Sequence, residues 1–179
     1  TLYSYGPEST FESMSVQAVA DVIEQLENHR ITITGGEPLL QETAVIELID
    51  ELTRRNPGYD FNIETNGTII PSFHRDNVWF TYDYKTPSSL AEEAMNLDIF
   101  KVATPADIIK FVVGSMQDLD RMNEILKTYP TDAQIFVSPV WGNIEGATII
   151  EYMKAHNWQN VRFQLQIHKF IWDPDAKGV

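Results

Sequence analysis

Apolar and polar positions along the chain follow two spacings, one typical of helices and one typical of buried strands. Apolar residues recurring at i, i+3, i+4 and i+7 predict helices over 15–28, 42–55, 116–127 and 144–155, and a further helix over 90–101. Short apolar and β-branched runs predict strands over 30–34, 60–64, 78–83, 108–113, 134–138 and 161–166. Because strands and helices alternate, the pattern predicts right-handed crossovers and a parallel sheet.

Six predicted strands are too few for a closed eight-fold barrel. We therefore expect an α/β fold in the form of a partial, open βα barrel, with a flavodoxin-like doubly wound sheet as the alternative. The segment 68–77 contains Pro71 and has no periodicity, which is typical of a surface loop.

Length and charge limit the kind of protein further. With 179 residues and 43% apolar content, the chain 1–179 is expected to form a single domain. A net charge of −13 argues against nucleic acid as a partner, since phosphate contacts are made mostly by Lys and Arg clusters. There is no run of about 18 apolar residues and no signal-peptide pattern, so we expect a cytoplasmic protein without a membrane partner. The absence of cysteine excludes disulfides and thiolate metal sites within these residues.

The predicted strands end in segments that carry polar groups, glycine or proline. Ligands of parallel α/β folds bind at the carboxyl ends of strands, which makes these segments the candidate site. They are Thr34-Gly35-Gly36-Glu37-Pro38, Glu64-Thr65-Asn66-Gly67-Thr68, Asp83-Tyr84-Lys85-Thr86-Pro87, Ser138-Pro139-Val140-Trp141-Gly142 and Gln166-Ile167-His168-Lys169. The fourth strand ends in Val113-Gly114-Ser115, which offers less chemistry.

Each segment also has a purely structural interpretation. Two glycines allow a close backbone approach to a ligand, yet Gly-Gly-Glu-Pro also suits a plain strand-to-helix turn. Asn66-Gly67 is a common turn dipeptide. Asp83 and Lys85 lie two residues apart and suit a simple ion pair, and His168 suits an ordinary surface position. Their occurrence at one edge of one sheet favours a binding site.

Taken together, these segments resemble the 7-carboxy-7-deazaguanine synthases, a family of radical S-adenosylmethionine enzymes. The resemblance covers essentially the whole chain. It rests on Thr32–Gln41 with its Gly-Gly-Glu-Pro, Ile63–Thr68 with its Glu-Thr-Asn-Gly-Thr, Asp83-Tyr84-Lys85, Lys110-Phe111-Val112-Val113 and Gln166-Ile167-His168-Lys169. Gly-Gly-Glu-Pro marks only the superfamily, whereas the combination is specific to the synthases.

The resemblance implies a lyase that converts 6-carboxy-5,6,7,8-tetrahydropterin to 7-carboxy-7-deazaguanine in queuosine or archaeosine biosynthesis. It implies S-adenosylmethionine, a [4Fe-4S] cluster and Mg²⁺ as cofactors, a reductant such as flavodoxin or ferredoxin, and a homodimer. The family's three cluster cysteines have no counterpart here. We therefore expect an N-terminally truncated fragment that begins shortly after the cysteine loop and is inactive by itself.

The resemblance also implies residue roles. Residues expected to bind S-adenosylmethionine are Gly35, Gly36, Glu37, Glu64, Asn66, Asp83, Tyr84 and Lys85. Those expected to contact the substrate are Thr34, Ser138 and His168, and Thr1 matches a magnesium ligand. The family often has Ser-Pro-Lys where this chain has Asp83-Tyr84-Lys85, a departure that affects Asp83 and Tyr84.

Three other interpretations stay open. A glycyl-radical-enzyme activating protein of the same superfamily would share Gly-Gly-Glu-Pro but would act on a protein. A cluster-free nucleoside-binding module would keep the site without the catalysis. An ordinary α/β domain would have these segments as turns only.

Overall fold

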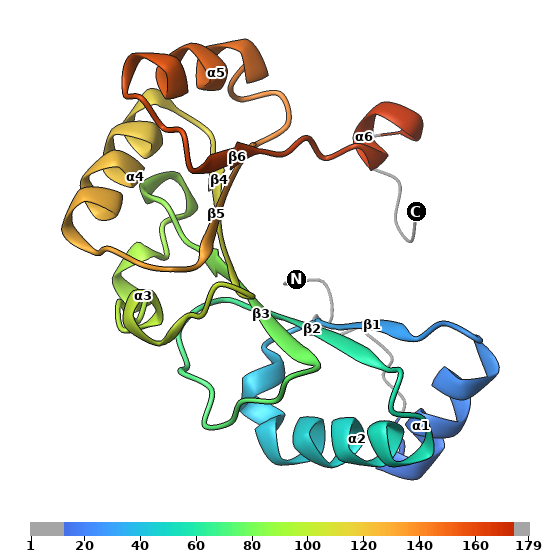
Figure 1. Ribbon diagram of the computed structural model, residues 1–179. Helices are drawn as coiled ribbons and strands as arrows, with labels where there is room; N and C mark the ends of the chain where they lie inside the picture. The colour runs from blue at the N-terminus through green and yellow to red at the C-terminus, as the bar shows by residue number, and fades with distance from the viewer. Residues whose placement is uncertain (1–12, 174–179) are drawn as a thin grey trace. The chain divides into compact units, whose positions relative to one another are not determined.

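The computed structural model describes residues 13–173, and its strands form one six-stranded sheet (Figure 1). The strands are β1 (Arg30–Ile33), β2 (Asp60–Thr65), β3 (Val78–Tyr84), β4 (Ile108–Val113), β5 (Gln134–Pro139) and β6 (Val161–Phe163). Their order in the sheet is β1-β2-β3-β4-β5-β6, and the pairs β1·β2, β4·β5 and β5·β6 are parallel. Sequential order confirms the open βα barrel and excludes the flavodoxin-like alternative, in which chain order and sheet order differ.

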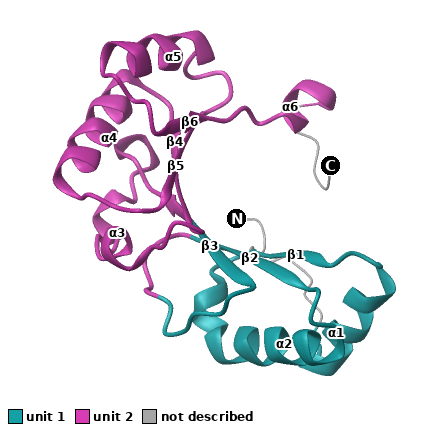
Figure 2. Ribbon diagram, viewed as in Figure 1, with its two compact units in different colours: residues 1–65, 71–81 teal, residues 66–70, 82–179 magenta. Residues whose placement is uncertain are grey.

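The chain groups into two compact units (Figure 2). Unit 1 contains Thr1–Thr65 and Pro71–Thr81, and unit 2 contains Asn66–Ile70 and Tyr82–Val179. Strand β3 passes from one unit to the other. The expectation of a single domain stays a prediction, and each unit is described by itself below.

Unit 1 packs α1 (Val16–Gln25) and α2 (Glu42–Arg55) with the first strands. The 3-10 helix η2 (Pro38–Gln41) lies between β1 and α2. Helix α2 has the predicted bounds because its buried residues Val45, Ile49 and Leu52 repeat with helical spacing. They share the core of unit 1 with apolar side chains of β2, chiefly Phe61 and Ile63.

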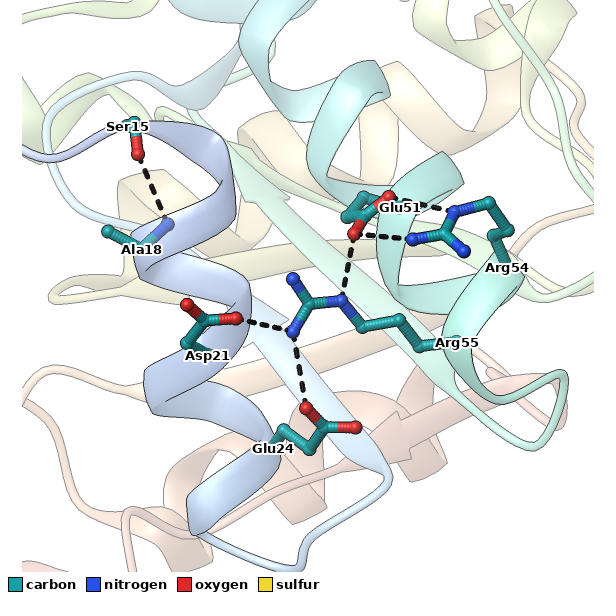
Figure 3. A network of polar contacts seen from close by, with 7 residues as sticks. All are labelled: Ser15, Ala18, Asp21, Glu24, Glu51, Arg54 and Arg55. Carbon is teal, nitrogen blue, oxygen red and sulfur yellow. Dashed lines mark hydrogen bonds and ion pairs between the residues drawn. The ribbon is translucent and has the colours of Figure 1, made fainter.

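Charged side chains join α1 to α2 on the surface of unit 1 (Figure 3). The Arg55 guanidinium donates to Asp21 at 2.6 Å, to Glu24 at 3.2 Å and to Glu51 at 2.8 Å. Arg54 donates to the same Glu51 carboxylate, at 2.8 Å. The hydrogen bonds from Arg54 and Arg55 lower the pKa of Glu51 to about 2, so the Glu51 carboxylate stays ionised over the whole physiological range.

Unit 2 places three of its helices on one side of its strands (Figure 1). These are α3 (Ile99–Val102), α4 (Met116–Thr128) and α5 (Gly146–Ala155), preceded by the 3-10 helices η3 (Pro87–Ser89) and η4 (Glu92–Ala94). Burial alternates along β4: Ile109, Phe111 and Val113 are buried, whereas Lys110 and Val112 are half-buried. In Figure 1, the later helix α6 (His168–Ile171) is drawn on the other side of the unit 2 strands from α3, α4 and α5.

Some predicted elements were wrong in extent or kind. The predicted helix over 90–101 is two short turns, η4 and α3, because Leu90 has a left-handed backbone (φ 56) and Asn96 caps Asp98 with its side chain. The predicted strand over 161–166 ends at Phe163, since its neighbour β5 ends in Pro139, which has no N–H for further pairing. The short helix α6 (His168–Ile171) was not predicted.

The other elements agree with the predictions to within three residues at each end. The segment 68–77 contains no helix or strand, as expected. Among residues 13–173, no helix has the length and apolar character to cross a membrane.

Candidate functional site

The turn after β1 has the backbone of a ligand-binding loop. Gly35 has φ 93 and Gly36 has φ 58, both in the left-handed region that side-chain-bearing residues rarely adopt. A Cβ built on Gly35 would meet no atom within 4 Å. The glycine is therefore required by backbone conformation, and no described residue fills the space beside it.

Glu37 follows the two glycines and is held by the turn itself. Its side chain is only 7% exposed, and its Oε1 accepts the N–H of Leu39 at 3.0 Å, which caps η2. Pro38 opens the 3-10 helix, where its missing N–H costs nothing. The carboxylate is thus fixed beside the glycines before any ligand arrives.

A cavity of about 400 Å³ in unit 1 reaches the same turn. Its volume is within the range of small-molecule sites. Most lining residues are apolar, and Thr34 and Gly35 contribute polar backbone and hydroxyl groups. The lining residues that matter here are Ile33, Thr34, Gly35, Pro38 and Gln41. Thr34 and the glycine turn thus line the same cavity, and the roles assigned to them stay predictions.

The end of β2 divides between the two units. Glu64 is exposed on β2 in unit 1. Asn66 is in unit 2, where its Oδ1 accepts from the backbone N–H of Thr68 at 3.0 Å and from its hydroxyl at 2.7 Å. Gly67 has φ 73, and a Cβ there would lie 2.6 Å from Cε of Met95. Asn66-Gly67 therefore forms the tight turn that its dipeptide predicts.

At the end of β3, the predicted tripeptide has a buried centre, Tyr84, between the half-buried residues Asp83 and Lys85. Lys85 and Asp83 form an ion pair, with their side chains 31% and 36% exposed. The Tyr84 ring packs 4.7 Å from that of Phe111, and its hydroxyl donates to Glu92 at 3.0 Å. Burial raises the pKa of Tyr84, and the Glu92 hydrogen bond raises it further. The Tyr84 side chain therefore serves the core, and any cofactor contact of this residue falls to its backbone.

The most buried carboxylate near these strand ends was missed by sequence reasoning. Asp118, in the first turn of α4, is 0% exposed. It accepts the backbone N–H of Ser88 at 2.9 Å and that of Gly114 at 2.7 Å. Its own N–H donates to Ser115 Oγ at 3.2 Å. Burial pushes the pKa of Asp118 upward, but the hydrogen bonds from Ser88, Gly114 and Ser115 together outweigh it and lower that pKa.

Two of the predicted substrate contacts also lie in unit 2. Ser138, in β5, is 1% exposed, and its Oγ has no hydrogen-bond partner among the described residues. A buried hydroxyl without a partner is costly, which is consistent with a role toward a ligand. His168 begins α6 and is exposed. Thr1 lies outside the described residues.

Comparison with known proteins identifies the family. A family profile described as "4Fe-4S single cluster domain" matches residues 4–85. The "7-carboxy-7-deazaguanine synthase" of Clostridium acetobutylicum is 36% identical over 171 residues, which are 93% of this chain and 76% of that protein. The proteins of the same name from Leptospira interrogans and Methanospirillum hungatei are 35% and 38% identical, covering 100% and 82% of this chain and 79% and 60% of theirs.

The chain therefore belongs to the 7-carboxy-7-deazaguanine synthase family of enzymes, which are lyases. This confirms the resemblance seen in the sequence. A solved structure titled "Native anSMEcpe with bound AdoMet" has a TM-score of 0.40 and 13% identity, covering 90% of this chain and 44% of its own. That similarity is too low to say anything about a ligand of this chain.

The residues present suit S-adenosylmethionine, but they include no ligand for an iron–sulfur cluster. The open space at Gly35 and the fixed carboxylate of Glu37 suit the methionine part of S-adenosylmethionine, whose ammonium group needs an anion. An iron–sulfur cluster needs thiolates, and the 179 residues include no cysteine. Within residues 13–173, no three His, Asp or Glu side chains are grouped to hold a metal ion.

Proposed function

We propose that this chain forms the cofactor- and substrate-binding part of a radical S-adenosylmethionine 7-carboxy-7-deazaguanine synthase. The substrate is 6-carboxy-5,6,7,8-tetrahydropterin and the product belongs to queuosine or archaeosine biosynthesis. The observation that carries the proposal is the left-handed Gly35-Gly36 pair followed by the buried Glu37. The reaction is inferred from the family to which the chain belongs.

The chain's own residues bind and orient the reactants. The backbone of Gly35 and Gly36 receives the methionine part of S-adenosylmethionine, and Glu37 pairs with its ammonium group. Glu64, Asn66 and the backbone of Asp83-Tyr84-Lys85 are the further cofactor contacts in this proposal. The proposed substrate contacts are Thr34, Ser138 and His168, and Thr1 is the proposed magnesium ligand. Bound S-adenosylmethionine supplies radical chemistry to the family's reaction.

The proposal also includes a [4Fe-4S] cluster, a reductant and a second copy of the chain. No residue of this sequence supplies a thiolate, so we expect no turnover from the 179-residue polypeptide alone. Product formed by this exact polypeptide would contradict that expectation. A flavodoxin or ferredoxin as reductant, a homodimer and a cytoplasmic location follow from the family resemblance.

The proposal is tested by the binding of S-adenosylmethionine, measured by isothermal titration calorimetry. Glu37→Gln keeps an oxygen for the Leu39 cap but removes the charge, and we expect about tenfold weaker binding, or about 1.4 kcal/mol. Glu47→Gln, an exposed charge change on α2, is the matched control and is expected to bind like the original chain. Equal binding by the Glu37 and Glu47 variants would refute the assignment of the cofactor site.

A further inference from the structure

The turn after β2 contains an asparagine followed by a glycine, and no other asparagine of the sequence has a glycine after it. In such a pair the backbone nitrogen of the glycine attacks the side-chain carbonyl carbon of the asparagine, because glycine has no Cβ to obstruct the approach. The attacking nitrogen gives its proton to hydroxide, a succinimide ring forms, and the side-chain nitrogen leaves as ammonia. Water then opens the ring to aspartate or isoaspartate. The reaction therefore needs water as its one co-reactant.

The side-chain carbonyl of Asn66 is held by two hydrogen-bond donors. Its Oδ1 accepts the backbone N–H of Thr68 at 3.0 Å and the Thr68 hydroxyl at 2.7 Å. Negative charge develops on this oxygen when the glycine nitrogen attacks, since the carbonyl carbon becomes tetrahedral. Two donors at these distances stabilise such an oxyanion, as they do in enzymes that catalyse acyl transfer. The turn after β2 thus supplies a donor pair suited to ring closure at Asn66.

The surroundings of Gly67 determine what the modification would change. Its carbonyl accepts the N–H of Asn96 at 3.1 Å, and a Cβ built on it would lie 2.6 Å from Met95 Cε. Isoaspartate adds one methylene group to the backbone between residues 66 and 67, which displaces the Gly67 carbonyl from Asn96. Gly67 is buried, but Asn66 is only half-buried, so solvent reaches the side chain that reacts. Deamidation would therefore alter both the charge and the backbone of this turn.

We propose that Asn66 is a site of spontaneous deamidation, and that Thr68 promotes the reaction through its two hydrogen bonds to Asn66 Oδ1. The proposal goes beyond the proposed function, because it concerns a covalent change of the chain itself. It has a consequence for that function: a carboxylate replaces the Asn66 amide among the proposed contacts of S-adenosylmethionine. The cofactor site then loses affinity as the protein ages in solution.

The test follows deamidation of the folded 179-residue chain at mildly alkaline pH. Peptide mapping by mass spectrometry detects the replacement of the amide by a carboxyl group, and reversed-phase chromatography separates isoaspartate from aspartate. We expect both products at residue 66 before any appear at the other asparagines. Thr68→Val keeps the shape of the side chain without its hydroxyl and should slow the reaction at Asn66 at least about threefold. Thr68→Ser keeps the hydroxyl and should react at nearly the original rate.

Two controls separate the hydrogen bonds from other effects. Unfolded in urea, the original chain and Thr68→Val should deamidate at equal rates, because the turn that brings Thr68 to Asn66 Oδ1 is then absent. Thr128→Val removes a hydroxyl that donates to Glu124 O within α4, far along the chain from the turn, and should leave the rate at Asn66 unchanged. Circular dichroism shows whether each variant is folded.

Two results would overturn the proposal. The first is a folded original chain that keeps its Asn66 amide while the unfolded chain loses it, a result that depends on no variant. The second is a folded Thr68→Val chain that deamidates at the original rate or faster, because the contacts to Oδ1 would then be neutral or protective. None of these measurements uses S-adenosylmethionine, so either result leaves the Glu37 comparison to decide the proposed function separately.

Discussion

The turn after β1 in unit 1 and the turn after β2 in unit 2 both depend on a glycine, yet for different reasons. Gly35 has φ 93, and a Cβ there would meet no atom of residues 13–173 within 4 Å. Gly67 has φ 73, and a Cβ there would lie 2.6 Å from Met95 Cε, inside the packed core of its turn. Two strand-end glycines that look alike in sequence therefore differ: one borders open space, and the other is enclosed by the scaffold.

The scaffold around Gly67 extends to a buried carboxylate. Asp118 ties the loop after β3 to the turn after β4 through Ser88 and Gly114. The turns after β2, β3 and β4 are thus held by internal contacts of unit 2, whereas the turn after β1 is capped by Glu37 and borders the cavity of unit 1. Substitutions in the enclosed set should cost folding stability, and those in the open turn should cost ligand binding.

The largest effect is expected from Asp118→Ala. The substitution leaves the N–H groups of Ser88 and Gly114 without their acceptor in a partly buried position and removes a fully buried carboxylate, at a cost of about 3 kcal/mol. Asp118→Asn keeps one acceptor oxygen and should lose less. The free energy of unfolding from urea titration measures both. An Asp118→Ala variant as stable as the original chain would show that the enclosed loops do not depend on this carboxylate.

The same carboxylate gives a pH dependence of known sign. The pKa of Asp118 is lowered in the folded chain, so folding favours its ionised form. The stabilisation is complete above the unfolded pKa of about 3.9 and is lost as the pH falls through the lower folded value. We expect the difference in unfolding free energy between Asp118→Asn and the original chain to be constant near neutral pH and to shrink below about pH 4. A difference that grows on acidification would contradict the assignment.

Gly67→Ala is expected to cost about 2 kcal/mol in unfolding free energy, because it combines a left-handed backbone with a collision. The collision is with the end of a flexible Met95 side chain, so the double variant Gly67→Ala, Met95→Ala isolates the backbone part. In the Met95→Ala background, Gly67→Ala should lower the unfolding free energy by less than it does in the original chain. Equal losses in the two backgrounds would mean that the contact contributes nothing.

Gly35→Ala should lower the unfolding free energy by about 1 kcal/mol. This is the cost of the left-handed backbone alone, because no atom of the described residues lies within 4 Å of the new Cβ. Binding of S-adenosylmethionine should fall much more than stability, since the Cβ enters the space that the cofactor occupies in the proposed function. Calorimetric titration and urea unfolding of the same sample separate the two. Undiminished binding of S-adenosylmethionine by Gly35→Ala would contradict the placement of the cofactor beside Gly35.

Much of the fold could be predicted because periodic burial determines it. Helix α2 and strand β4 have the predicted bounds, as each buries a regular set of apolar residues. The segment 90–101 could not be predicted in this way. Its two short turns are set by local contacts, such as the hydrogen bond from Asn96 N to Gly67 O at 3.1 Å, which connect residues far apart in sequence.

The candidate site was predictable only in part, and Asp118 shows why. Motifs named the glycine turn and Lys85 as candidates, and those roles stay predictions. The buried carboxylate of Asp118 in α4 has no sequence signal except Ser115, three residues before it. A serine three residues before an acid is a capping pattern, which indicates where the helix starts. It does not reveal that the Asp118 carboxylate accepts the N–H of Ser88.

The smallest effect is expected at the surface network of unit 1, which contrasts with the buried carboxylate of unit 2. Arg55 contacts three carboxylates, but those of Asp21 and Glu24 are mostly exposed (Figure 3). Exposed ion pairs are weakened by solvent and salt, so Arg55→Ala should shift the urea midpoint only slightly at low salt, and the shift should nearly vanish at about 1 M salt. Arg54→Ala, which removes a guanidinium bound to Glu51 alone, is the control and should shift it less. A large loss that persists at high salt would mean that α1 and α2 depend on Arg55 as the unit 2 loops depend on Asp118, and the contrast between the two units would fail.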